Sequence, residues 1–132
     1  MNQNIEAIVK YRIEQAEEAL KDAEILLESG GSLRSVINRS YYAMFYAVLA
    51  LIAVKGRGSS KHYSAISIFD KEYVKEGIFP KEMSKILHKA FLLRQESDYK
   101  EFNIITKEET ETIKSGAENF FNRIKTHLNI IV

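Results

Sequence analysis

Arg94, Asp98 and Tyr99 bring a guanidinium, a carboxylate and a phenol close together near the end of an amphipathic segment. Counting back from Arg94 by helical steps leads along an apolar stripe made of Met83, Leu87 and Ala90. An arginine on a buried stripe costs free energy unless it is paired, and Asp98, one turn further on, lies within reach of a bidentate pair. Two interpretations stay open. The group is either a structural clasp, or a site where Arg94 binds phosphate or stabilises negative charge while Tyr99 or Asp98 moves a proton.

A second polar group, Asn38, Arg39 and Tyr42, opens an apolar helix. Asn38 and Tyr42 are one turn apart, and Phe45 continues along roughly the same side. The Asn38 amide, placed beside aromatic rings, could hydrogen-bond across to the segment that carries Arg94. The alternative is that Asn38 only satisfies a buried neighbour. We regard Asn38, Arg39 and Tyr42 as candidate ligand-binding residues.

A third candidate group surrounds His62, which opens a short predicted helix beside Lys61 and a glycine-containing loop. A helix N-terminus with Lys61 and Arg57 nearby could hold an anion. The loop lacks the spacing of a phosphate-binding P-loop. The histidines do not have metal-ligand spacing, no Glu-x-x-His pair is present, and there is no cysteine. We expect neither a metal nor another cofactor, and thiol catalysis is excluded.

The charge of the chain is close to balanced overall but unevenly distributed. The formal net charge is +1, yet residues 1–30 carry seven acidic against three basic residues, and residues 31–62 carry five basic residues and no acidic one. The total charge gives no argument for nucleic-acid binding. The two regions could attract each other as neighbouring helices, or the basic region could bind a ligand.

No targeting or membrane segment is predicted. The N-terminus lacks a basic region followed by an apolar run, so it does not resemble a signal peptide. The uncharged run Tyr41–Val54 has 14 residues, which is too short to span a bilayer. We expect a cytoplasmic protein without membrane contact.

The elements that must position these groups are all helical, since no segment alternates with a period of two. Apolar spacing predicts helices over residues 5–28, 32–55, 61 to 69 or 73, 80–99, and from 106 onward. Gly30 and Gly31 end the first helix, Ser32 is a candidate N-cap, and Thr106 begins a capping box. With 132 residues, the chain is expected to form one domain over residues 1–132. That domain should be an all-α, up-and-down antiparallel bundle of four main helices plus one short helix.

The first half of the chain is rich in aromatic residues: Tyr11, Tyr41, Tyr42, Phe45, Tyr46 and Tyr63. A surplus of aromatic side chains over what one small core needs can indicate a helix-face dimer interface. Core filling is the alternative use for most of them.

Taken together, several segments resemble the HEPN family, the higher eukaryotes and prokaryotes nucleotide-binding domain, in its small stand-alone prokaryotic branch. They are Ala16-x-x-Ala19-Leu20-x-x-Ala23, the run from Asn38 to Phe45 (Asn-Arg-Ser-Tyr-Tyr-Ala-Met-Phe), His62, and the run from Arg94 to Tyr99 (Arg-Gln-Glu-Ser-Asp-Tyr). The resemblance covers nearly the whole chain in the right order. It implies a helical bundle that forms a homodimer. It also implies a gene paired with a minimal nucleotidyltransferase in a toxin–antitoxin module.

The resemblance also implies a reaction, because active HEPN proteins are metal-independent ribonucleases. Their signature is an arginine followed, after four to six residues, by a histidine, and two copies meet across the dimer. Arg94 matches the arginine and Asn38 the polar residue that faces the motif, but Tyr99 stands where the histidine should be. A tyrosine has an ordinary pKa of about 10, against about 6.5 for histidine. His62 could replace the missing group if its helix packs near Arg94.

Three functions follow, in order of preference. The first is a nucleotide- or RNA-binding partner of a nucleotidyltransferase. The second is a metal-independent endoribonuclease toxin with a degenerate motif, in which Arg94 stabilises charge and Tyr99, His62 or Asp98 moves protons. The third is a non-catalytic dimeric interaction bundle in which Arg94 and Asp98 form a clasp.

Overall fold

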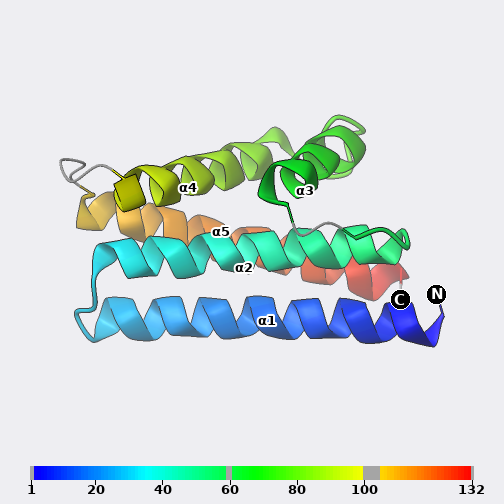
Figure 1. Ribbon diagram of the computed structural model, residues 1–132, viewed down its shortest axis with the longest axis horizontal. Coiled ribbons are helices and arrows are strands. Elements are labelled where there is room, and N and C mark those ends of the chain that lie inside the picture. Colours follow the sequence, from blue (N-terminus) through cyan, green and yellow to red (C-terminus); the bar gives the residue numbers. More distant parts are fainter. Residues whose placement is uncertain (1, 59–60, 100–104, 132) are drawn as a thin grey trace.

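A computed structural model describes residues 2–58, 61–99 and 105–131, with side chains described except at 96–99 and 130–131. The elements are α1 (Gln3–Glu28), α2 (Leu33–Val54), α3 (His62–Phe69), the π-helix η1 (Asp70–Val74), α4 (Lys81–Tyr99) and α5 (Lys107–Ile131). The four long helices run alternately up and down, so that α1 begins and α5 ends at the same end of the bundle (Figure 1). The predicted all-α antiparallel bundle is confirmed.

The helix boundaries follow the capping residues read from the sequence. Ser32 accepts a hydrogen bond from the backbone of Ser35 at 3.1 Å and caps α2, as predicted. Thr106 accepts one from the backbone of Glu109 at 3.0 Å at the start of α5. Gly30, with φ of 78°, supplies the left-handed conformation that ends the turn after α1. The side chains of Ser32 and Thr106 each satisfy a backbone N–H group that has no partner within its helix.

Helix α2 is the centre of the bundle, packed against α1, α3, α4 and α5. Fourteen of its residues are buried, which explains why it is apolar nearly all round. Its full length, Leu33–Val54, exceeds the uncharged run read from the sequence, and by length and composition it could cross a membrane. However, 78% of its most apolar window is buried inside the protein, so packing in the core accounts for that composition.

The segment after α3 differs from the predicted single short helix, because it continues as a π-helix. In η1, Tyr73 is buried and donates a hydrogen bond to the carbonyl of Leu51 at 3.1 Å. Leu51 belongs to the last turn of α2, where carbonyl groups lack N–H partners within the helix. Glu72 of η1 accepts hydrogen bonds from Lys55 and Arg57, and these lower the pKa of its carboxyl group. These hydrogen bonds from Tyr73 and to Glu72 hold η1 against the C-terminal end of α2.

The α4 stripe predicted from the sequence faces the core, since Met83, Leu87 and Ala90 are all buried. Helix α4 also approaches α5 closely at Gly116, where an added Cβ atom would lie 2.6 Å from Cγ1 of Ile86. These contacts fix the direction of α4 and so the position of Arg94 in its last turns.

Candidate functional site

His62 and Tyr41 form the centre of the site. The first residue of α3, His62, places Nδ1 2.6 Å from the hydroxyl oxygen of Tyr41 on α2. The two rings stack with centroids 5.6 Å apart. This contact joins residues that are 21 positions apart, and it positions the short helix α3 against α2.

An aromatic wall supports the histidine. Phe45 stacks on His62 with centroids 4.3 Å apart and an interplanar angle of 7°. Phe91 of α4 lies 6.0 Å from His62 and 5.5 Å from Tyr41, measured between ring centroids. Tyr41, Phe45 and Phe91 are buried, whereas His62 is half-buried. The imidazole therefore has one apolar, rigid side and one side that solvent can reach.

Arg94 lies against the same wall from α4. Its guanidinium carbon is 5.5 Å from the ring centroid of Tyr41 and 5.1 Å from that of Tyr42. A guanidinium over aromatic faces gains cation–π attraction, and its planar shape suits this stacking. The half-buried Arg94 is thus held at the end of the apolar stripe of α4, against two tyrosine rings of α2. Tyr41 contacts both His62 and Arg94, so the condition set for His62 to replace the motif histidine is met: α3 packs near Arg94.

The two ionisable rings have shifted pKa values. Burial lowers the pKa of His62, and the nearby positive charge of Arg94 lowers it further. Burial raises the pKa of Tyr41 well above its ordinary value, against the opposing effect of Arg94. At neutral pH a neutral imidazole therefore faces a protonated phenol. The hydroxyl of Tyr41 can donate to Nδ1 or accept from it, depending on which ring nitrogen carries the proton.

Asn38, Arg39 and Tyr42 extend the site along α2. Arg39 donates to the side-chain oxygen of Asn38 through Nε at 3.2 Å and Nη2 at 2.9 Å. Its guanidinium carbon lies 5.2 Å from the ring centroid of Tyr42, so two arginines contact that ring. In the described part of the chain, the hydrogen bonds of Asn38 are made within its own helix and not across to α4. Arg39 also lines a polar hollow with Glu18 and Asp22 of α1, which fits the attraction predicted between the acidic and basic regions.

Not every candidate residue is brought to this place. Arg57 pairs with Glu72 beyond the end of α2, and the rise of a helix puts that end about 18 Å from Tyr42. Lys61 is exposed and directly precedes His62. The side chains of Asp98 and Tyr99 lie outside the described residues. Roles for these four residues in binding or proton transfer stay predictions.

Tyr41 and Phe45 are among the aromatic residues for which the sequence leaves a dimer interface and core filling open, and neither was predicted to be a site residue. Tyr41 is the residue that contacts both His62 and Arg94, and Phe45 makes the closest ring contact with His62. The only available signal was their position in the same α2 run as Asn38. Both roles depend on where α3 returns along α2, which apolar spacing does not encode.

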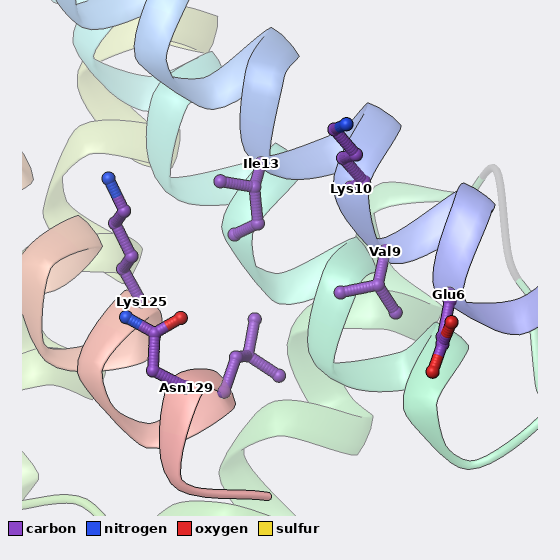
Figure 2. Close-up of a pocket in the computed structure, with 7 residues that line it drawn as sticks. Glu6, Val9, Lys10, Ile13, Lys125 and Asn129 are labelled. Atoms are coloured by element: carbon purple, nitrogen blue, oxygen red, sulfur yellow. The ribbon is translucent and has the colours of Figure 1, made fainter. Parts of the chain in front are cut away.

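A separate hollow of about 370 Å³ lies between α1 and α5. It is lined by Glu6, Val9, Lys10 and Ile13 of α1 and by Lys125, Leu128 and Asn129 of α5 (Figure 2). Lys125 pairs with Glu17 at 3.0 Å. None of the candidate site residues lines this hollow. Among the described residues, no group of three or more histidine, aspartate or glutamate side chains is placed to hold a metal ion.

The protein is an antiparallel helical bundle in which an arginine near the end of α4 lies against two tyrosine rings of α2, and comparison with known families identifies its class. Residues 9–127 match the family model described as the HEPN domain, and the chain belongs to the HEPN family. The family read from the sequence is confirmed.

Curated relatives cover most of the chain. A Thermotoga maritima protein named "UPF0332 protein" is 38% identical over 91% of this chain and 90% of its own length. A Methanocaldococcus jannaschii protein named "Putative toxin" is 36% identical over the whole of this chain and 97% of its own length. A second protein of that organism with the same name is 34% identical over 88% of this chain and 78% of its own length.

Proposed function

We propose that this HEPN protein is the toxin-like member of a toxin–antitoxin module and binds RNA or a nucleotide through Arg94. The observation that carries the proposal is the pair of guanidinium groups, Arg94 and Arg39, whose carbons lie 5.1 Å and 5.2 Å from the centroid of one half-buried ring, Tyr42. The toxin names of two relatives support the biological context. The expected assembly is a cytoplasmic homodimer with a shared cleft, paired with a minimal nucleotidyltransferase.

A phosphate group binds well where a positive charge is held in a fixed position and is partly shielded from water. Arginine stays charged at all working pH values and presents a planar set of donors that fits phosphate. The stacking of Arg94 on Tyr41 and Tyr42 orients that plane before a ligand arrives, which reduces the entropy lost on binding. Arg39 adds a second permanent charge one helical turn before the Tyr42 ring.

Titration of the purified full-length chain with a labelled single-stranded RNA, and separately with ATP, tests the proposal. Arg94→Ala should weaken RNA binding and should reduce the slope of log K against log salt by about 0.7, the value for one lost phosphate contact to a single strand. Arg123→Ala is the matched control, since it removes the same charge from an exposed position on α5. Equal effects of the two variants, or an unmodified chain that binds neither ligand, would contradict the proposal.

The proposed assembly has its own tests. Sedimentation of the purified chain should give the mass of a dimer. Co-expression with the minimal nucleotidyltransferase that the proposal expects to be encoded beside this protein should yield a complex that survives purification. A monomer at all concentrations, together with no captured nucleotidyltransferase, would contradict this part and leave RNA binding to be judged by the titration.

A metal-independent ribonuclease is the second candidate, and the shared contact of His62 and Arg94 with Tyr41 favours it. In the tautomer with a proton on Nδ1, the Tyr41 oxygen accepts a hydrogen bond from that N–H group, and Nε2 is left as a base. Nε2 would take the proton of a ribose 2′-hydroxyl, and the 2′-oxygen would attack the adjacent phosphorus. The 5′-oxygen would leave with a proton from water, giving a 2′,3′-cyclic phosphate, while Arg94 stabilises the added negative charge. The hydroxide left by that water would take the proton from Nε2 and restore the neutral imidazole.

The reaction is testable without a metal. In EDTA, the unmodified chain should cut RNA to cyclic-phosphate products, and both Arg94→Ala and His62→Phe should abolish cutting. Expression should arrest growth, with relief by Arg94→Ala. RNA that stays intact at high protein concentration in EDTA would argue against the reaction while leaving the binding function standing.

A further inference from the structure

Tyr63 is the most exposed of the large hydrophobic side chains in the described residues, at 71% of its full accessible surface. It is nevertheless held in place. Its ring meets Phe91 of α4 edge to face, with centroids 5.1 Å apart and an interplanar angle of 87°. Its hydroxyl oxygen accepts a hydrogen bond from Nε2 of Gln95 at 3.4 Å. Two contacts with α4 therefore restrict the orientation of a largely exposed aromatic ring.

This ring is adjacent to the proposed phosphate site on both helices that build it. Tyr63 follows His62 in α3, and Gln95 follows Arg94 in α4. His62 and Arg94 both contact Tyr41, while Tyr63 and Gln95 contact each other. The ring of Phe91 lies 5.1 Å from that of Tyr63 and 5.5 Å from that of Tyr41, which Arg94 contacts, so the exposed ring and the guanidinium border the same pair of buried rings.

A rigid exposed aromatic ring beside a fixed positive charge is the arrangement that single-stranded nucleic acids require. Every nucleobase has an apolar face that stacks on such a ring, and the backbone phosphate pairs with the charge. In a duplex, an internal base is covered on both faces by its neighbours, so it cannot use the ring. Leu92, also exposed on α4, adds apolar surface on the same helix.

Resting on the proposed function, we infer that Tyr63 is a stacking platform for an unpaired nucleobase of single-stranded RNA whose phosphate lies at Arg94. Gln95 holds the ring, and its amide can also reach the edge of the stacked base. The site thus selects unpaired RNA over duplex RNA. The ligand is identified by an unpaired base and a phosphate of the same strand, and base sequence is not read by the stacking itself.

The test measures binding of the full-length chain to two labelled probes. One is a uridylate dodecamer, and the other is a dodecamer of abasic ribose phosphate with the same charge. Tyr63→Leu should weaken binding of the uridylate probe by roughly 5- to 150-fold, the range for loss of one aromatic stacking contact. It should leave the abasic probe unaffected. Tyr63→Phe keeps the ring but loses the hydroxyl that Gln95 contacts, so it should weaken binding of the uridylate probe less than Tyr63→Leu does and leave the abasic probe unaffected.

Four outcomes would overturn the inference. Unchanged uridylate binding by Tyr63→Leu, with loss in Arg94→Ala, would reject stacking and keep the proposed function. Equal weakening for both probes by Tyr63→Leu would show that the ring does not act through the base. Conversion of a dimer to a monomer by Tyr63→Leu would assign the ring to a subunit contact. An unmodified chain that binds neither probe would reject the RNA-binding function together with the inference.

Discussion

The hydrogen bond between Tyr41 and His62 predicts a measurable coupling energy. We expect Tyr41→Phe and His62→Phe each to destabilise the protein, and the double variant to lose less than the sum of the two. Both replacements keep a ring in place. Tyr41→Phe retains the contacts with Phe45 and Phe91, and His62→Phe retains the stack on Phe45. The cycle therefore isolates the contact between the hydroxyl and the imidazole.

The magnitude follows from burial and distance. Tyr41 is fully buried, and its hydroxyl lies 2.6 Å from Nδ1, so the geometry is that of a good hydrogen bond. Such a bond contributes about 0.5–1.5 kcal/mol net. Because His62 is only half-buried, water can replace part of the lost bond in the Tyr41 variant. We therefore expect a coupling of about 1 kcal/mol, near the middle of that range.

The assay is urea unfolding followed by far-UV circular dichroism, which reports directly on an all-helical protein. Measurements near pH 8, above the ordinary histidine pKa of about 6.5, keep His62 neutral. Tyr11→Phe, at an exposed tyrosine, is the control and should change the free energy of unfolding by less than about 0.5 kcal/mol. Additivity of the two single variants within about 0.3 kcal/mol would refute the reasoning.

Three further predictions concern other parts of the protein. Because the pKa of His62 is lowered in the folded state, its contribution to stability is present in full above pH of about 6.5 and is lost as the pH falls through the folded-state pKa. Urea unfolding from pH 8 to pH 5 should therefore show a steeper loss in the unmodified chain than in His62→Phe, and parallel curves would contradict this. Tyr73→Phe should lower the free energy of unfolding by about 1–3 kcal/mol, because it leaves the buried carbonyl of Leu51 without its hydroxyl donor. Its RNA affinity should be unchanged. A melting temperature equal within error to that of the unmodified chain would show that the Tyr73 hydroxyl does not stabilise the end of α2. Gly116→Ala should be destabilised by up to about 2 kcal/mol, since overpacking against Ile86 outweighs the gain in helix propensity. Adding Ile86→Val to the Gly116→Ala variant should restore part of the lost stability. A higher melting temperature for Gly116→Ala alone would show that α4 can shift away from α5 at little cost.

The helices could be predicted from the sequence because their signals are local. Ser32 and Thr106 cap the helices they were expected to cap, and apolar spacing placed Arg94 on the buried stripe of α4. Local signals do not specify how separate helices meet. The contact of Tyr41 with His62 depends on α3 returning along α2 after a loop, and this follows from three-dimensional packing.

The same limit explains two differences between what the sequence predicted and what the structure shows. A π-helix has no distinct pattern of apolar residues, so Asp70–Val74 was expected to be the end of a short helix or the start of a loop. Arg57 was grouped with Lys61 because they are close in sequence. In the structure Arg57 pairs with Glu72, which follows α3 and could not be identified as its partner from spacing.

The division of the site between α3 and α4 has a consequence for local opening of the protein. In a motif carried by one helix, the backbone fixes the distance between arginine and histidine. Here His62 and Arg94 belong to different helices, and α3 has only eight residues, so their distance depends on α3 staying in place. Short elements open more readily than the long helices around them. A ligand that bridges both side chains would suppress that opening, and the amide protons of α3 should then exchange with deuterium more slowly than in the unliganded protein, while those of the buried α2 change little.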